Sequence, residues 1–295
     1  MMPVSLPVLV LFISSIGWGL TWLPLKYLNQ QGMQGPLLVF VAFGAAALAL
    51  LPAFARQKRH WLGQLRYLGL IALFGGFANL SFQIALYQGE VIRVMILFYL
   101  LPVWSVLGGR LYLGERIDGL RLVTVSGALV GAFLILGGGA MFDTRSSWVD
   151  LLAVASGMAF AMNNIVFRAT QSLPVTSKVT AVFVGCAVMM GGYLLVATPT
   201  PAVYGWQTLM LTMLYGVVWV MLITFGTQWG VTRLEAGRAS IIIIMELVAA
   251  VVSASLLLGE TLAPRELVGG LLVLATVVAE TLREVVTPQI SPGQP

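Results

Sequence analysis

One acidic residue, Glu246, stands inside a long apolar segment, in the run Ile-Ile-Ile-Ile-Met-Glu-Leu at positions 241–247. A carboxyl group in such a segment can carry a proton or bind the ammonium group of a ligand. It can equally be a structural group that is protonated and hydrogen-bonded to a neighbouring helix. Both interpretations are open from the sequence.

Amide side chains occur in other apolar segments at helical spacing. Asn79 and Gln83 lie four residues apart and share one helix face with Tyr87. Thr224 and Gln228 repeat the spacing 145 residues later. Such polar groups are costly in apolar surroundings unless they meet a partner or a wet cavity. The two faces therefore predict a polar cavity, and hydrogen bonds between packed helices are the alternative.

Aromatic residues and further amides complete the candidate site. Asn163 and Asn164 are adjacent in one apolar segment, and at least one is expected to point inward. The hydroxyl group of Tyr99 needs a partner or water. The site is also expected to include Trp18, Thr21, Trp22 and Trp219. The first two tryptophans have a second interpretation, as lipid-facing or interfacial residues.

Two prolines mark places where a helix can bend. Pro24 and Pro102 have no backbone N–H, so the carbonyl groups of Leu20 and Phe98 lose their usual helical partner. Both prolines are predicted hinges. For Pro102 the alternative is a proline that is tolerated in a packed bundle.

The elements that must position these residues are membrane-spanning helices. The 295-residue chain is 59% hydrophobic and 9% charged, against about 25% charged residues in ordinary soluble domains. Continuous apolar runs of about 20 residues are typical of transmembrane helices and not of barrel strands. We predict ten, at 6–26, 36–54, 67–87, 93–110, 120–139, 148–169, 178–198, 206–231, 237–258 and 265–283. The first lacks a basic leader and a cleavage site, so it is expected to be retained.

A pattern that recurs after 145 residues divides the chain into two halves. Gln83, Glu90, Arg93 and Leu113-Gly114-Glu115 are matched by Gln228, Glu235, Arg238 and Leu258-Gly259-Glu260. Five crossings in each half would give the two copies opposite orientations. We therefore predict an all-α integral membrane protein with ten transmembrane helices, arranged as two inverted five-helix repeats around a central cavity. The repeats are 1–142 and 143–284, and a disordered tail follows at 285–295.

Charges at the ends of the segments predict the orientation in the membrane. With the N-terminus inside, the internal segments carry twelve Lys and Arg residues and the external segments carry four. An excess of positive charge belongs on the cytoplasmic side, so both termini are expected in the cytoplasm. Loop charge also accounts for the net charge of +5, and no nucleic-acid partner is expected.

Several classes of function lack the residues that they need. No glycine-rich loop followed by Lys-Ser or Lys-Thr is present, which argues against a nucleotide-driven motor. The only histidine, His60, lies in a basic loop, and the only cysteine is Cys186. No enzyme activity, metal site or cofactor is therefore expected, and no disulfide can form within one chain.

The chain resembles the EamA group of the drug/metabolite transporter superfamily over about residues 8–283. The residues that carry the resemblance are Trp18-Gly19 with Lys26, Leu101-Pro102-Val103 before Leu113-Gly114-Glu115, and Glu246 before Leu258-Gly259-Glu260. The second half departs from the pattern, because Leu247 occupies the place of Pro102. Within the group the chain is most similar to YddG-type exporters of aromatic amino acids, which are bacterial inner-membrane proteins.

The resemblance implies an inner-membrane exporter of amino acids, especially aromatic ones, that works by alternating access between its two repeats. Amides for the charged ends of a zwitterion and an apolar wall for its side chain suit such a cargo. We expect a monomer whose partners are the small-molecule cargo and the lipid bilayer. The first alternative is another cargo, such as a cationic drug or nucleoside anchored by Glu246. The second is a non-transporting scaffold or receptor with a dry interface between the polar faces.

Overall fold

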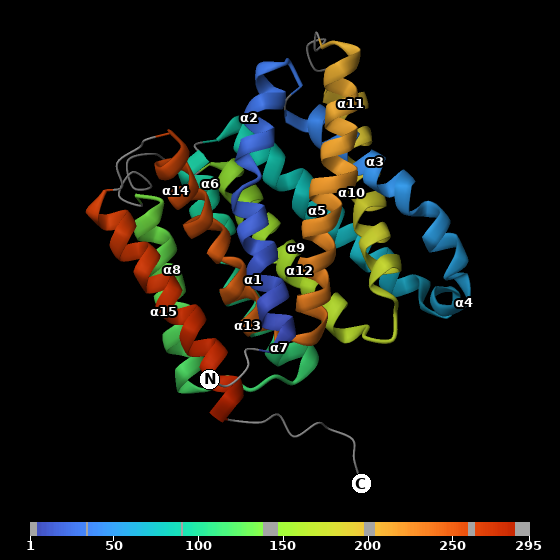
Figure 1. Ribbon diagram of the computed structural model, residues 1–295. Helices are drawn as coiled ribbons and strands as arrows, with labels where there is room; N and C mark the ends of the chain where they lie inside the picture. The colour runs from blue at the N-terminus through green and yellow to red at the C-terminus, as the bar shows by residue number, and fades with distance from the viewer. Residues whose placement is uncertain are drawn as a thin grey trace.

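The computed structural model describes residues 5–33, 35–89, 91–137, 147–197, 204–258 and 263–286. Within these ranges every regular element is a helix. The helices stand side by side in one bundle, and α1 begins at the end of the bundle where α15 finishes (Figure 1). We call this the near end of the bundle and the opposite one the far end.

The first half of the chain contains two divided helices and three long ones. Its elements are α1 (Leu6–Gly19), α2 (Trp22–Gln30), α3 (Gly35–Arg56), the short α4 (Lys58–Trp61), the 3-10 turn η1 (Leu62–Gln64), α5 (Leu65–Gln88), α6 (Val91–Phe98), α7 (Leu101–Leu113) and α8 (Gly119–Ile135). Here α1 with α2, and α6 with α7, each correspond to one predicted apolar run.

The second half follows the same order of elements with different breaks. Its elements are α9 (Trp148–Ala169), α10 (Val175–Ala197), α11 (Trp206–Leu214), the π-helical turn η3 (Tyr215–Val220), α12 (Met221–Arg233), α13 (Ala236–Ile243), α14 (Met245–Leu258) and α15 (Pro264–Val286). A π-helical turn is rare and occurs frequently at functional sites.

Eight apolar stretches of the described chain have the length and hydropathy of membrane-spanning helices. They correspond to the predicted runs one to four and six to nine. The fifth run is the apolar but shorter α8, and the tenth is α15, which carries charged residues near both ends. These two helices pack along each other at one edge of the bundle (Figure 1). The multi-pass helical class is therefore confirmed, and the number of ten crossings stays a prediction.

Two helices break at positions that correspond in the two halves. The break between α6 and α7 lies at Tyr99 and Leu100, and Pro102 is the second residue of α7. The break between α13 and α14 lies at Ile244, 145 residues after Tyr99. Because Leu247 replaces the proline there, the second break has a cause other than a missing N–H group.

The first predicted helix is also divided, just ahead of Pro24. Because α1 ends at Gly19 and α2 begins at Trp22, the proline lies in the first turn of α2. Pro24 cannot donate a hydrogen bond to the Leu20 carbonyl group. That carbonyl group accepts one from the Leu23 N–H instead, at 3.1 Å. The expected free carbonyl at Leu20 is thus satisfied by a tighter turn.

The packing partners of the two halves correspond. α5 packs on α9 and on α10, while α12 packs on α1 and η3 packs on α3. Likewise α6 and α7 pack on α9, while α13 and α14 pack on α1. If each helix is replaced by its counterpart in the other half, every one of these contacts becomes another contact that the structure contains. This correspondence supports two copies of one unit.

Glycines bring two of the equivalent helix pairs close together. Gly185 of α10 faces the backbone of Ala72 on α5, and Gly216 of η3 faces the backbone of Ala42 on α3. A Cβ atom at either glycine would overlap the opposite carbonyl group. Small residues at such crossings are the usual means of close helix packing in membranes.

Some predictions fall outside the described residues. These are Glu90, the turn at Gly259-Glu260, the repeat boundary at 142–143, the tail from 287 onward and the side chain of Tyr87. The predicted disordered tail began two residues too early, because residues 285 and 286 form the end of α15.

Candidate binding cavity

A cavity of about 370 Å³ lies within the bundle and is lined by helices of both halves. Toward the far end its lining includes Leu25, Leu38 and Leu86. Toward the near end the lining stops at Gln228 on α12 and Ile243 on α13. The cavity therefore extends from the middle of the bundle toward the far end.

Ten of the twelve residues predicted for the site line this cavity. They are Trp18, Thr21, Trp22, Asn79, Gln83, Tyr99, Asn163, Thr224, Gln228 and Glu246. The other two lie outside the lining. Asn164 is buried beside Asn163, and Trp219 donates its indole N–H to Thr21 Oγ1 at 3.3 Å. Each of the two therefore contacts a residue that does line the cavity.

Hydrogen bonds hold the two tryptophans of the first helix against the second half. Trp18 Nε1 donates to Thr227 Oγ1 on α12 at 3.1 Å. Trp22 Nε1 donates to Ser253 Oγ on α14 at 3.0 Å. Both rings line the cavity, which favours a role in the site for these tryptophans over the lipid-facing alternative.

Three phenylalanines that join Tyr99 in an aromatic wall of the cavity were not predicted from the sequence. The ring centroid of Phe98 lies 4.5 Å from that of Phe82, 5.4 Å from that of Tyr99 and 5.9 Å from that of Phe160. All four side chains line the cavity. Helical spacing could have predicted Phe82, because it lies three residues from Asn79 on the same helix face.

Amides from α9 and α12 meet at the near-end floor of the cavity. Asn163 Nδ2 and Gln228 Nε2 both donate to Asn164 Oδ1, at 3.4 and 3.5 Å. Thr224 lies one turn from Gln228, on the same face of α12. The repeat-related Asn79 is arranged differently, because its Nδ2 donates to the Gly75 carbonyl group of its own helix at 2.9 Å.

Glu246 is the only acidic or basic residue among the described lining residues of this cavity. It is the second residue of α14 and lies in the first turn after the helix break at Ile244. Its Oε1 accepts a hydrogen bond from the Tyr99 hydroxyl group at 2.5 Å, which joins the two helix breaks of the two halves. The described lining contains no lysine or arginine. The charge of the lining thus favours cations and zwitterions over anions.

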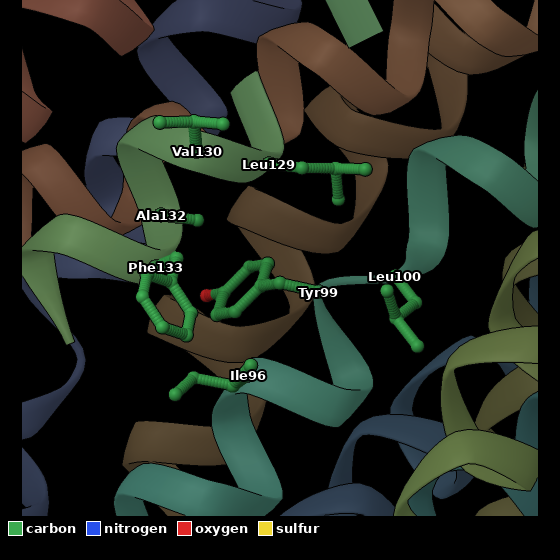
Figure 2. A pocket seen from close by; sticks show the side chains of 7 residues that line it. All are labelled: Ile96, Tyr99, Leu100, Leu129, Val130, Ala132 and Phe133. Carbon is green, nitrogen blue, oxygen red and sulfur yellow. The ribbon is translucent and has the colours of Figure 1, made fainter. Parts of the chain in front are cut away.

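Tyr99 also borders a second, apolar pocket of about 260 Å³. Figure 2 shows its ring among side chains from the α6–α7 break and from α8. These neighbours are Ile96, Leu100, Leu129, Val130, Ala132 and Phe133. Tyr99 therefore forms part of the wall between the central cavity and this pocket.

Polar contacts between the halves close the bundle at its near end. Gly114 ends α7 in a left-handed conformation with φ of 69°, and Glu115 then accepts hydrogen bonds from the Ala236 N–H at 2.9 and 3.0 Å. Arg121 on α8 pairs with Glu235 at 2.5 Å and with the fully buried Glu280 at 3.2 Å. Burial raises the pKa of the Glu115 carboxyl group above its ordinary value.

A buried lysine on α10 joins that helix to α9 and α12 at the near end. Lys178 Nζ donates to the Phe167 and Thr170 carbonyl groups at the end of α9, at 2.9 and 3.1 Å. It also donates to Thr232 Oγ1 at 3.1 Å. Its three N–H groups are thus used, and a cation suits the C-terminal end of a helix. From the sequence this lysine counts only as loop charge.

At the far end an ion pair joins α6 to α9. Arg93 binds both carboxylate oxygens of Asp150, at 2.7 and 2.8 Å. Asp150 also accepts a hydrogen bond from the Ser147 N–H and so caps α9. Arg93, one of the residues of the internal repeat, thus links the first half of the chain to the second.

Comparisons with known proteins agree with a duplicated membrane protein. The family model for EamA-like transporters matches residues 5–137 and again residues 147–279. A protein of Streptantibioticus cattleyicolor named "Probable terminal-alkyne amino-acid exporter" is 29% identical over 291 residues, or 94% of each chain. A crystal structure described only as that of a protein superposes with a TM-score of 0.78 at 16% identity. The match covers 95% of this chain and 100% of that one and supports the fold alone.

Proposed function

This chain belongs to the EamA-like transporter family, and from that premise we propose that it exports amino acids, aromatic ones in particular, through the central cavity. The observation that carries the proposal is the lining of this cavity. It combines uncharged amides with an aromatic wall and contains no basic side chain among the described residues. A zwitterion with an aromatic side chain needs both kinds of surface.

The relative from Streptantibioticus cattleyicolor supports an amino-acid cargo. Its name concerns terminal-alkyne amino acids, and its similarity extends over nearly the whole of both chains. The aromatic specificity that we propose here rests on Phe82, Phe98 and Phe160, whose rings contact one another at tilted angles in the cavity lining.

We propose alternating access between two inverted repeats as the mechanism. Each family match spans one half of the chain, and the helix breaks at Tyr99 and Ile244 lie at corresponding positions. Ten crossings, with α8 and α15 included, give each half an odd number of helices and hence opposite orientations. Most polar contacts that must break during the cycle are those at the near end, around Arg121 and Lys178.

The near end is assigned to the cytoplasm of a bacterial inner-membrane protein. Exposed cations gather there, at the end of α3, along α4 and at the start of α5, and positive loops face the cytoplasm. Because the cavity extends toward the far end, this conformation faces outward. The protein works as a monomer, since the duplication already supplies both halves of the cavity.

A cationic drug is the second candidate cargo, and Glu246 is the observation that favours it. A single carboxylate in a cavity that is otherwise uncharged attracts a monovalent cation. Aromatic side chains such as Trp18 and Trp22 add cation–π attraction. The two cargo classes differ in whether this carboxylate is needed.

Uptake of radiolabelled phenylalanine and tryptophan into proteoliposomes tests the proposal. We expect saturable uptake that Gln83→Ala and Gln228→Ala each reduce strongly. Gln171→Ala is a matched control, because Gln171 lies on an exposed turn outside the cavity lining. Cysteine probes at positions 83 and 228 address the scaffold hypothesis, which requires a dry interface and hence no labelling by a water-soluble thiol reagent.

A further inference from the structure

Three buried polar atoms at the floor of the cavity have no hydrogen-bond partner. They are Asn163 Oδ1, Thr224 Oγ1 and Gln228 Oε1. The three residues are 1%, 6% and 3% exposed, and all three line the cavity. A buried polar atom left unpaired costs about 1–3 kcal/mol. Folded proteins keep few of them, so three in one place call for a ligand.

The neighbouring hydrogen bonds determine which end of each amide is available. Asn163 Nδ2 and Gln228 Nε2 are both directed at one acceptor, Asn164 Oδ1. Each NH2 group thus directs one N–H bond at a protein acceptor, whereas the carbonyl oxygens of both amides have no partner. The hydroxyl group of Thr224 adds a third acceptor, because a hydroxyl oxygen has lone pairs available.

A primary ammonium group has the chemistry that matches this floor. It offers three N–H donors and no acceptor, whereas a carboxylate offers acceptors only. Hydrogen bonds from a charged donor are about twice as strong as those between neutral groups.

We propose that Asn163, Thr224 and Gln228 form the binding site for the ammonium group of the cargo. This rests on the proposed function and specifies which end of the amino acid is held. The ammonium group enters first, toward the near end, and the carboxylate stays in the part of the cavity nearer the far end, where Gln83 lies. A neutral site holds the charge without forming an ion pair, so release requires no separation of opposite charges.

Competition against bound radiolabelled phenylalanine on the purified full-length protein tests this orientation. Phenylalanine methyl ester keeps the ammonium group and masks the carboxylate, and N-acetylphenylalanine does the reverse. We expect the ester to compete within about tenfold of phenylalanine. N-acetylphenylalanine should compete at least about a hundredfold less well, because it loses bonds worth about 1.5–3 kcal/mol each.

A matched pair of variants locates the effect at the floor. Gln228→Leu removes an acceptor at nearly constant volume and should weaken binding of phenylalanine and of the ester by about 10- to 100-fold. Gln171→Leu is the same change on an exposed turn outside the cavity lining and should leave the affinity for both ligands unchanged. The two analogues need no variant, so the proposal stays testable on the unaltered chain.

The outcomes separate this site from the function as a whole. Equal competition by the two analogues would overturn the ammonium site and leave the amino-acid cargo in place. Stronger competition by N-acetylphenylalanine would mean that the amides present their NH2 groups and hold the carboxylate, which also overturns it. Absence of any phenylalanine binding by folded protein would overturn the proposed function and the site together.

Discussion

Replacing Glu246 by glutamine distinguishes the two cargo classes most sharply. The change removes the only charge among the described lining residues and keeps an oxygen that can accept the Tyr99 hydroxyl group. The size and shape of the side chain stay nearly the same. Any effect on binding therefore reports the charge itself.

The expected magnitude follows from the charge separation. A cation in contact with the carboxylate, with the two charges about 4 Å apart, gains about 4 kcal/mol at an effective dielectric constant of about 20. This corresponds to about a thousandfold in affinity. A zwitterion has no net charge, so its carboxylate offsets the attraction of its ammonium group to Glu246. For phenylalanine we expect about a tenfold loss or less.

Binding of radiolabelled benzyltrimethylammonium and of phenylalanine to the purified protein measures both effects. Tyr99→Phe is the matched control, because it removes the hydrogen bond to Glu246 and keeps the charge. The reasoning is refuted if Glu246→Gln weakens phenylalanine as much as the cation. It is refuted as well if Tyr99→Phe and Glu246→Gln weaken the cation equally.

Three further predictions concern the contacts that hold the bundle. Asp150→Asn breaks the mostly buried pair with Arg93 and should cost about 3 kcal/mol, seen as a lower melting temperature in detergent; an unchanged melting temperature would contradict this. Gly185→Ala introduces a Cβ against the Ala72 backbone and should cost about 1–3 kcal/mol by overpacking, whereas Gly192→Ala, where nothing is near, should be neutral. Burial raises the folded-state pKa of Glu115 above its ordinary 4.5. Between these two pKa values the folded protein keeps a proton that the unfolded chain has lost. The free energy of unfolding therefore falls as the pH rises from about 4.5 through the raised value. Glu115→Gln should remove that part of the slope in melting temperature against pH, and an unchanged slope would refute the assignment.

The helical class could be predicted because apolar length alone demands it. Every predicted run corresponds to described helices, since a lipid-exposed backbone has to satisfy its own hydrogen bonds. The breaks were only partly predictable. Pro24 and Pro102 lie within one or two turns of a break. The break at Ile244 has no nearby proline or glycine that would predict it.

The candidate site was predictable where polar residues face apolar surroundings. Asn79, Gln83 and Gln228 line the cavity, because periodicity places them on inward faces. Periodicity could not separate Asn163 from Asn164, since adjacent residues point in different directions and both are buried. The roles of the near-end charges depend on contacts between helices that are distant in sequence, which one sequence cannot reveal.

The resemblance to the EamA group, drawn from scattered residues, is confirmed by the family matches in both halves. The transporter class follows from it. The aromatic cargo depends on the lining of one cavity, so a direct test must place the amino acid in that cavity while transport occurs.

Exchange of radiolabelled phenylalanine across proteoliposome membranes tests the central claim most directly. Liposomes containing the protein and preloaded with unlabelled phenylalanine should take up external label faster than liposomes preloaded with buffer. Gln228→Ala should remove most of this stimulation. A folded, reconstituted protein whose uptake does not exceed that of protein-free liposomes under either condition would contradict the claim that the cavity carries aromatic amino acids.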